Sequence, residues 1–548
     1  MKLTPQLRDR TFRWIADDVD PAARVELQQV LARAMGGAPD ALGELEDRMS
    51  GPLTFGTAGL RGPVRAGVNG MNRSVVVRTT YGVASWLAHK GQSGGLVVVG
   101  RDARNGSAEF FRDVVGVLAA AGFQVCQLDG PLPTPVTAFA VRHLGAVAGI
   151  QITASHNPPA DNGYKLYDAA GTQIVPPDDR LIEAAIRDAP AAVSVPRIDV
   201  FPSTRDDIVD AYYSRVATLP RSESRTLKVV LTPMHGVGGH PAVTVLGKAG
   251  FTDVHLVADQ AEPDPGFPTV SFPNPEEPGA ADLLLAAAAS HDADLAIALD
   301  PDADRCALGV RQDGRWRMLR GDETGALLGQ YVLSTSDSTA DRLVATTIVS
   351  SALLGSIAKA HGARYDETLT GFKWLVRAGD GSGTGLVFAY EEALGNCVDP
   401  DQVRDKDGIS AAVVACDLAA SLKAAGRTLL DVLDELATAH GVHLTDQVSL
   451  RVTDLPLIGR LMSQLRSAPP TTLAEVAVTV TDLLPQADVL RFTGPGVRVI
   501  IRPSGTEPKL KAYLEVVEPV ANDLAAARTA ASTRLSALRA EISALLGA

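Results

Sequence analysis

The chain has few cysteines and lacks any long apolar run. Its 548 residues contain four cysteines and no C-x-x-C pair, so neither a zinc site nor a disulfide framework is expected. No stretch approaches 18 uninterrupted apolar residues, and residues 1–18 carry charges throughout. Neither a membrane span nor a signal peptide is therefore expected. Together these absences predict a cytoplasmic protein with no membrane partner.

The chain also lacks an excess of positive charge. Its formal net charge is −13 at pH 7, whereas a nucleic-acid binder needs a basic surface to offset the phosphate backbone. No nucleic-acid partner is therefore expected. An acidic protein can still bind a phosphorylated small molecule, because a few clustered Arg and Lys side chains are enough to make one cleft positive.

Length and periodicity predict several domains. A chain of 548 residues exceeds the size at which a single hydrophobic core stops growing, which predicts three or four domains. Apolar residues at helical spacing over residues 1–50 are followed by three α/β rhythms, and then by strand-like alternation and an Ala-rich helix. The predicted domains are an α/β domain I at 1–205, an α/β domain II at 206–318, an α/β domain III at 319–441 and an α+β domain IV at 442–548.

Three aspartates alternate with other residues directly after an apolar run, in Asp300-Pro301-Asp302-Ala303-Asp304-Arg305. Alternate residues of an extended backbone point the same way, so the three carboxylates can converge. Two carboxylates about 4 Å apart repel by about 4 kcal/mol at an effective dielectric of about 20, so three together call for a cation. Oxygen ligands favour Mg²⁺ or Ca²⁺, although the spacing is not that of an EF-hand loop. A solvated acidic turn stays open.

A serine with a neighbouring histidine lies in the segment Thr153-Ala154-Ser155-His156-Asn157-Pro158. Such a pair is typical of an activated hydroxyl, but the G-x-S-x-G elbow of one large class of hydrolases is absent. The Asn-Pro-Pro and Asn-Gly steps that follow predict a rigid turn with Ser155 at its tip. Taken alone, a segment of this kind is more often only a turn.

Three further turns could bind an anion or a sugar. The segment Arg502–Lys509 (RPSGTEPK) contains the backbone N–H groups, hydroxyls and guanidinium of a phosphate nest. It lacks the nucleotide-binding P-loop pattern, so ATP is not implied. The paired Glu391 and Glu392 follow an apolar run and could hold sugar hydroxyls, and the Gly-rich stretch 54–62 contains Arg61 and could wrap an anion. Each of these could also be a solvated turn.

As a set, these five segments resemble the alpha-D-phosphohexomutase superfamily, in the expected order and over nearly the whole chain. The resemblance implies four domains around a central cleft: three related α/β domains and a C-terminal α+β domain similar to the TATA-binding-protein fold. It also implies an intramolecular phosphotransferase. Such an enzyme converts a sugar 1-phosphate into the sugar 6-phosphate and back, through a phosphoserine and a bisphosphate that turns end for end.

The resemblance assigns roles to residues of this sequence. Ser155 would carry the phosphoryl group, and one Mg²⁺ per chain would be held by Ser155, Asp300, Asp302 and Asp304. The catalytic groups beside them would be His156, Lys165, Arg305 and Arg61. The residues that read the sugar would be Gly371, Phe372, Lys373, Glu391 and Glu392. The phosphate that does not react would be gripped by Arg502, Ser504, Gly505 and Thr506.

The identity of the sugar stays open. Many relatives have Ser in the sugar-reading turn, whereas here Ala393 stands there, with Leu394 before Gly395. This looks more like the branch that contains phosphoglucomutase-2, phosphopentomutase and some bacterial phosphomannomutases. We expect mannose and/or glucose phosphates as substrates, a hexose 1,6-bisphosphate as activator, and a monomer or homodimer.

Four alternatives accompany this prediction. The first is a phosphatase with an aspartyl nucleophile at Asp300, which is disfavoured because Ala303-Asp304 follows where those enzymes have Gly-Thr. The second and third are a phosphopentomutase and a sugar bisphosphate synthase of the same branch. The fourth is a regulatory paralogue that binds sugar phosphates without catalysis.

Overall fold

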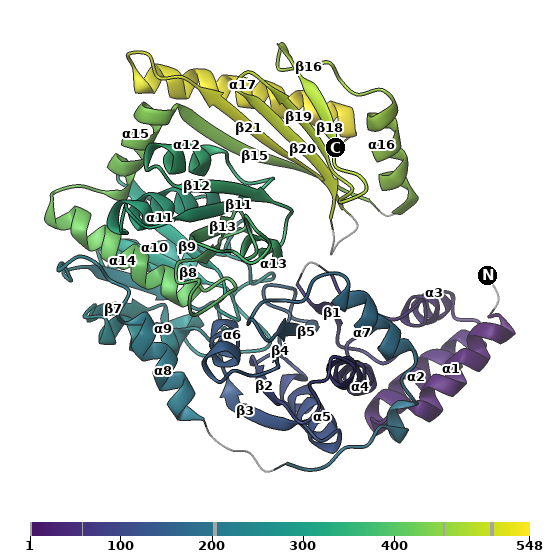
Figure 1. Ribbon diagram of the computed structural model, residues 1–548. Coiled ribbons are helices and arrows are strands. Elements are labelled where there is room, and N and C mark those ends of the chain that lie inside the picture. The colour runs from purple at the N-terminus through teal and green to yellow at the C-terminus, as the bar shows by residue number, and fades with distance from the viewer. Residues whose placement is uncertain (1–2, 57, 201–204, 453–454, 505–508, 548) are drawn as a thin grey trace. The chain divides into compact units, whose positions relative to one another are not determined.

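The computed structural model describes residues 3–56, 58–200, 205–452, 455–504 and 509–547 (Figure 1). They form two compact units, one made of residues 1–318 with 399–417 and the other of residues 319–398 with 418–548. Among the described residues, no single helix is long and apolar enough to cross a membrane. The bent pair α14 (Gly408–Ala424) and α15 (Leu429–His440) meets the criteria of length and composition only when its two helices, at 91°, are taken together.

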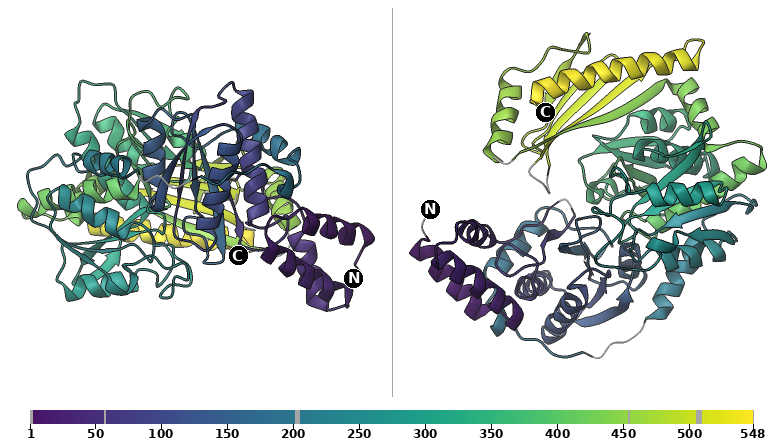
Figure 2. Two further views of the ribbon diagram at one scale, coloured as in Figure 1. Left: turned by 90° about the horizontal axis from the view of Figure 1, so that it is seen from below. Right: turned by 180° about the vertical axis from the view of Figure 1, so that it is seen from behind.

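Three helices open the first unit, as the sequence predicts: α1 (Pro5–Asp17), α2 (Pro21–Met35) and α3 (Pro39–Arg48). Each begins with a proline, whose fixed φ suits the first helical position. Thr4 and Asp20 cap the first two through their side chains. The helices pack on one another around a small apolar core of their own and form a separate group at the start of the chain (Figure 2).

The first sheet of this unit has the order β1-β5-β4-β2-β3. Strand β2 is parallel to β3 and β4, while β5 is antiparallel to β4 and β1. Its strands are β1 (Leu60–Pro63), β2 (Leu96–Arg101), β3 (Gln124–Pro131), β4 (Ala148–Ile152) and β5 (Asp161–Asp168). Helices α5 (Ser107–Ala120) and α6 (Thr134–His143) pack against its strands, while α4 (Arg73–His89) packs on α5 and on α7 (Asp178–Arg187). Every residue of β4 is buried, as expected of a strand covered on both faces.

The second sheet of the first unit has the order β10-β9-β8-β6-β7. Its strands are β6 (Lys228–Thr232), β7 (Asp253–Leu256), β8 (Leu295–Leu299), β9 (Cys306–Gln312) and β10 (Arg315–Met318). The accompanying helices are α8 (Asp206–Val216), α9 (Gly239–Lys248) and α10 (Asp282–Ser290). The fully buried apolar strand β8 and its antiparallel neighbour β9 are joined by the acidic segment predicted to bind a cation.

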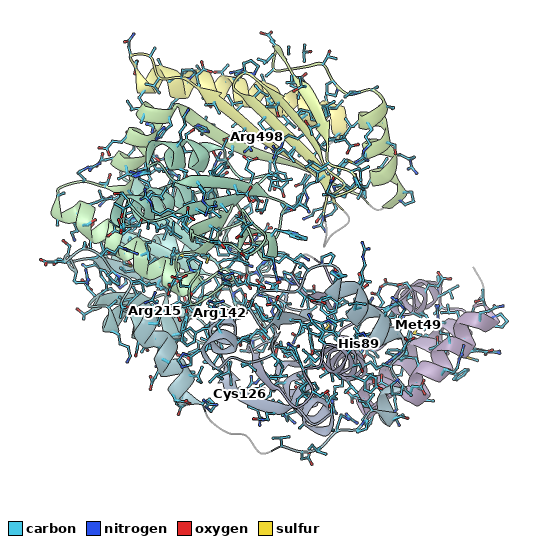
Figure 3. All side chains as sticks on the ribbon, viewed as in Figure 1. Met49, His89, Cys126, Arg142, Arg215 and Arg498 are labelled. Carbon is cyan, nitrogen blue, oxygen red and sulfur yellow. The ribbon has the colours of Figure 1, made fainter. Side chains whose placement is uncertain are left out.

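The segment 399–417 brings a later part of the chain into the first unit. Its acidic residues make the contacts: Asp399 pairs with Arg215, and Asp405 accepts a hydrogen bond from Tyr167 at 2.8 Å. The backbone oxygen of Asp401 accepts a hydrogen bond from Arg142 at 2.9 Å. Figure 3 labels the two arginines.

The second unit contains a mostly parallel sheet of order β12-β11-β13-β14. Its strands are β11 (Leu343–Thr347), β12 (Arg364–Thr368), β13 (Leu386–Glu391) and β14 (Gly395–Cys397). The helices of this part are α11 (Gly321–Thr335), α12 (Leu353–Ala360) and α13 (Phe372–Leu375). Because β11, β12 and β13 are parallel, the loops that follow them lie at one edge of the sheet.

The last sheet is antiparallel, with the order β15-β21-β20-β19-β18. Its strands are β15 (Val442–Arg451), β18 (Thr479–Asp482), β19 (Leu490–Gly494), β20 (Val497–Pro503) and β21 (Lys509–Glu518). The long helix α17 (Leu524–Leu546) lies across one face of this sheet (Figure 1). Helix α16 (Leu455–Ser467) and the short pair β16 (Thr472–Leu473) and β17 (Val476–Ala477) complete this part. The three α/β parts and the α+β end confirm the predicted fold class, and the exact domain boundaries stay a prediction.

Candidate active site

Ser155 lies in a tight loop at the end of the buried strand β4. Its side chain is 1% exposed, and its backbone has φ 53°, the left-handed region that residues other than glycine seldom adopt. The hydroxyl of Thr153 accepts a hydrogen bond from the backbone N–H of Ser155 at 2.9 Å. A strained backbone of this kind persists only where its surroundings hold it, and it is often found at functional sites.

The serine loop is held by Arg104, a residue that no sequence motif predicts at this site. Its guanidinium donates hydrogen bonds of 2.6 to 3.1 Å to four backbone carbonyl oxygens, those of Ser155, Asn157, Pro158 and Asp161. Arg104 lies 3.6 Å from the Asp102 carboxylate and over the ring of Phe267. Its position just after β2 is the signal in the sequence, because β2 and β4 are parallel neighbours whose carboxyl ends meet.

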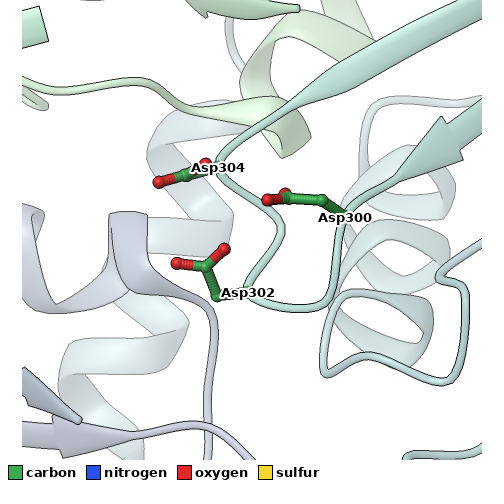
Figure 4. A group of neighbouring side chains, drawn as sticks. All are labelled: Asp300, Asp302 and Asp304. Carbon is green, nitrogen blue, oxygen red and sulfur yellow. The ribbon is translucent and has the colours of Figure 1, made fainter. Parts of the chain in front are cut away.

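The three aspartates between β8 and β9 converge, as their alternation predicts. Asp300, Asp302 and Asp304 are fully buried, and one carboxylate oxygen from each lies within 4.8 Å of the others. Figure 4 shows the three side chains turned towards a common space. Ala303 adopts φ 55° between them, so the loop is a curled turn rather than an extended strand.

The serine loop and the acidic loop meet. Ser155 Oγ donates a hydrogen bond to Asp300 Oδ2 at 2.8 Å and lies 3.3 Å from His156 Nδ1. Burial raises the pKa of Asp300 well above its usual value, and the charges of Asp302 and Asp304 raise it further. Asp300 therefore holds its proton more strongly than an exposed carboxyl, and ionisation of all three aspartates calls for positive charge beside them.

Two buried lysines supply positive charge at this position. Lys165 Nζ on β5 lies 2.6 Å from both Asp302 Oδ2 and Asp304 Oδ2. Burial alone would lower the pKa of Lys165, but the two carboxylates raise it above its usual value, so the amine is an ammonium ion. Lys406, from the segment 399–417, lies 3.4 Å from Asp304 and 3.7 Å from Asp405. No local pattern in the sequence predicts the place of Lys406, because nothing near it in the chain links it to residue 304.

The other predicted catalytic side chains also lie around the serine. Arg61 on β1 donates to the side-chain oxygen of Asn157 at 3.0 Å. Arg305 is buried and follows the last aspartate, with Nη1 3.8 Å from Glu276. Burial lowers the pKa of His156 well below its usual value, and the nearby Arg305 and Arg61 lower it further. His156 is therefore a neutral imidazole at pH 7.

The aspartate cluster fits a small divalent cation. The donor set consists of carboxylate oxygens, which Mg²⁺ prefers. Asp302 Oδ1 and Asp304 Oδ1 are buried without a hydrogen-bond partner among the described residues, and such oxygens ordinarily have one. The lysine contacts use the Oδ2 oxygens instead. The residues that could hold the metal are thus the three aspartates, with an oxygen at Ser155 beside them.

The predicted sugar-reading residues lie in the second unit, at the carboxyl edge of the parallel sheet. Glu391 ends β13, and Glu392 accepts hydrogen bonds of 3.1 Å from the hydroxyls of Thr347 and Ser350. Gly371 precedes α13, which contains Phe372 and Lys373. The Phe372 side chain is 2% exposed and belongs to the core, so only its backbone can face a ligand.

Of the predicted phosphate grip, the structure describes Arg502 and Ser504, at the end of β20 and directly after it. Arg502 is in β20, and the backbone N–H of Ser504 donates to the Lys509 carbonyl at 2.8 Å, which closes the base of the loop. Gly505 and Thr506 lie outside the described residues.

The site combines a buried hydroxyl with converging carboxylates and buried cations. This combination is typical of enzymes that transfer phosphoryl groups, because their catalysis rests on positioning and charge stabilisation. Comparison with protein families identifies the group within this class. Four models of the phosphoglucomutase/phosphomannomutase family match in succession: alpha/beta/alpha domains I, II and III at residues 52–192, 209–314 and 320–440, and the C-terminal domain at 452–532. The chain belongs to this family and is a mutase, which confirms the resemblance seen in the sequence.

Known proteins support the assignment. A probable phosphomannomutase of Haemophilus influenzae is 44% identical over 81% of this chain and 93% of its own length. A probable phosphoribomutase of Schizosaccharomyces pombe is 34% identical over 93% and 94%. A solved family protein of Burkholderia thailandensis has the same fold, with a TM-score of 0.70 and 22% identity over 90% of this chain and 97% of its own.

Proposed function

We propose that this mutase interconverts a hexose 1-phosphate and the hexose 6-phosphate, with Ser155 as the carrier of the transferred phosphoryl group. The observation that carries the proposal is the 2.8 Å hydrogen bond from Ser155 Oγ to Asp300. It sets the hydroxyl against the aspartate cluster, inside a buried site that also contains Lys165 and Lys406. Burial keeps bulk water from a phosphoserine at this position, which protects it from hydrolysis.

Each half-reaction exchanges one P–O bond for another. In the first, the bond between phosphorus and Ser155 Oγ breaks and a bond between phosphorus and the free sugar hydroxyl forms. That hydroxyl loses its proton, and Ser155 Oγ gains one. The bisphosphate then turns end for end. In the second, the other phosphoryl group leaves its sugar oxygen for Ser155 Oγ, which loses its proton, and the sugar oxygen gains one.

The two predicted acid–base groups differ in charge, which suits different roles. His156 is neutral because burial lowers its pKa, and its ring lies 3.3 Å from Ser155 Oγ. It can therefore accept the proton of the attacking hydroxyl and return it. Lys165 stays an ammonium ion because its pKa is raised by the aspartates. It holds Asp302 and Asp304 in place and offsets negative charge. Bound Mg²⁺ would supply further stabilisation of charge on the phosphoryl oxygens.

The residues of the second unit would select the substrate. Glu391 and Glu392 would accept hydrogen bonds from sugar hydroxyls, while Arg502 and Ser504 would hold the phosphate that does not react. A grip that recognises phosphate, and not the carbon that bears it, suits a bisphosphate that binds in two orientations. A hexose 1,6-bisphosphate would also activate the enzyme, since it can donate a phosphoryl group to an unphosphorylated Ser155.

Mannose and glucose phosphates are the proposed substrates. The family is described by these two sugars, and the relative that is 44% identical is named for mannose. A relative of 34% identity that matches over nearly its whole length is named for ribose, so ribose 1-phosphate is the second candidate. All three sugar phosphates present the phosphate and hydroxyl groups that the site recognises.

A comparison of kcat/KM for glucose 1-phosphate, mannose 1-phosphate and ribose 1-phosphate tests the proposal, with Mg²⁺ and the matching bisphosphate present and products followed by phosphorus NMR. The hexose phosphates should be isomerised fastest, without stoichiometric release of free phosphate. Ser155→Ala should bind substrate but not isomerise it, whereas Ser334→Ala, a helix hydroxyl far along the chain, should be fully active. Full activity of Ser155→Ala would refute the role of the serine, and stoichiometric release of phosphate would indicate a phosphatase instead.

A further inference from the structure

Arg498 makes a set of buried contacts that the proposed mechanism does not use. Its side chain is 13% exposed and pairs with Glu515 at 2.8 Å and with Glu367 at 3.1 Å. The same guanidinium donates to the backbone carbonyl of Ser350. Arg498 lies in β20 of the last sheet, whereas Ser350 and Glu367 follow or end strands of the parallel sheet. Figure 3 labels Arg498.

Glu515 reinforces the same connection between the two sheets of this unit. It lies opposite Arg498 on β21 and accepts hydrogen bonds from Ser351 Oγ at 2.6 Å and from the Ala352 N–H at 2.9 Å. The Nδ1–H of His443 on β15 donates to the same carboxylate at 2.9 Å. These charged groups are removed from water, and in the protein interior hydrogen bonds and ion pairs are stronger. A buried network whose members are paired therefore has a rigid geometry.

Ser350 joins Arg498 to the sugar-reading turn. While its carbonyl accepts from Arg498, its hydroxyl lies 3.1 Å from the Glu392 carboxylate and accepts from the Glu392 N–H at 3.0 Å. The hydroxyl of Thr347 lies 2.7 Å from that of Ser350 and contacts the same carboxylate. A displacement of Ser350 would therefore displace Glu392.

The strand β20 joins Arg498 to the phosphate grip. Residues 498, 500 and 502 share one face of the strand because side chains alternate. Ile500, between the two arginines, is buried in an apolar cluster with Ile348 and Val349 of the loop after β11. The Cα atoms of Arg498 and Arg502 are thus about 13 Å apart along a strand, and the face that these residues share is packed on that loop.

We infer that Arg498 is a positioning residue that sets the spacing between the sugar-reading Glu392 and the phosphate-gripping Arg502. The inference rests on the proposed function of these two residues. A fixed spacing between the two grips measures the length of the substrate, since a hexose 6-phosphate places its phosphate one carbon further along than a pentose 5-phosphate. Arg498 thereby contributes to discrimination between hexose and pentose phosphates without touching either.

The variant Arg498→Lys keeps the charge but loses the fork that reaches Ser350, Glu367 and Glu515 together. We expect the ratio of kcat/KM between the preferred sugar phosphate and the poorer one to fall at least tenfold, mostly through KM, because a difference of one carbon is worth about 10- to 200-fold in discrimination. The matched control is Arg491→Lys. Arg491 pairs with the same Glu367 at 2.8 Å from the neighbouring strand, and its variant should keep the ratio of the parent.

The outcomes are distinct. An unchanged ratio in Arg498→Lys, an equal loss for all sugars, or the same loss in Arg491→Lys overturns the inference. If the parent isomerises none of the sugar phosphates, the proposed function itself fails and the inference with it. If Arg498→Lys does not fold, Glu367→Gln removes one anchor and leaves the Arg498–Glu515 pair intact. That variant should lower the ratio in the same direction, and an unchanged ratio there overturns the inference.

Discussion

The guanidinium of Arg104 donates a 2.6 Å hydrogen bond to the backbone carbonyl of Ser155, 51 residues further along the chain. Ser155 is thus held through its own main chain, which has a left-handed conformation at this residue. The hydroxyl is left to face Asp300. The position of Ser155 therefore depends on Arg104, which bonds the serine loop only through backbone carbonyl oxygens.

Replacing Arg104 by lysine tests this dependence. A single ammonium cannot replace the planar guanidinium that binds four carbonyl oxygens. We therefore expect Ser155 to shift by up to about 1 Å. We expect kcat to fall about 100-fold, as such displacements do at other active sites, with little change in KM. Steady-state kinetics measures this, with Arg142→Lys as control because Arg142 binds carbonyl oxygens away from the serine loop. An unchanged kcat would contradict the role of Arg104.

Removal and return of magnesium tests the aspartate cluster. After chelation, added Mg²⁺ should raise the melting temperature of the parent, because a ligand that binds only the folded state stabilises it. Asp302→Asn and Asp304→Asn should lose most of this rise, since each replaces a carboxylate of the cluster, one oxygen of which is buried without a partner within the described part of the chain. Asp407→Asn, a buried carboxylate outside the cluster, should keep it. Calorimetry with and without the metal measures all four proteins, and equal rises would contradict the metal site.

Asp407 should make the first unit less stable as pH rises. Burial raises its pKa to about 6, although Ser410, Tyr212 and Ile409 donate hydrogen bonds to it. The folded state therefore keeps the proton up to about pH 6, while the unfolded chain releases it near pH 4. Folded molecules bind more protons at Asp407 in this window. The contribution of Asp407 to the free energy of unfolding is therefore greatest below pH 4 and falls as pH rises to 6.

The variant Asp407→Asn removes this effect, because an amide oxygen can accept the same hydrogen bonds without a charge. Its stability relative to the parent should grow by about 3 kcal/mol between pH 4 and pH 7, which is two pKa units at about 1.4 kcal/mol each. Melting temperatures of the two proteins across this range at constant ionic strength measure the difference. A difference that does not vary with pH would show that Asp407 is ionised throughout.

Gly59 should tolerate no side chain. It has φ +83°, and a Cβ there would lie 2.4 Å from the Tyr164 carbonyl oxygen. Gly91 has φ +74° with nothing within 4 Å, so Gly91→Ala isolates the cost of the backbone conformation, about 1 kcal/mol. Gly59→Ala should cost about 1 to 3 kcal/mol more through overpacking. It should also lower kcat by displacing β1 and Arg61. Chemical denaturation gives the energies, and equal costs for the two variants would contradict the close approach.

Local patterns in the sequence predicted much of the fold. The apolar runs at 295–299 and 386–390 are strands β8 and β13 almost to the residue, because a buried strand needs an unbroken apolar run. The Ala-rich helix predicted after the strand-like alternation is α17. Residues 476–480 alternate like a single strand but are divided between β17 and β18, since an exposed edge offers no burial to keep one strand regular. The turn predicted at 153–158 is also present, whereas residues 300–305, whose aspartates were expected to converge from an extended backbone, form a turn.

Alternation and turn chemistry act over a few residues, so the sequence by itself determined the elements, the acidic loop and the serine turn. Arg104 and Lys406 entered the site only through tertiary structure, since one reaches 51 residues along the chain to Ser155 and the other about 100 residues to Asp304. Burial then decided what these groups do. Burial keeps His156 neutral, and it places the charged Lys165 between two aspartates. It also makes Phe372 part of the hydrophobic core. Desolvation and Coulomb interactions depend on which groups pack together, and no local pattern records that.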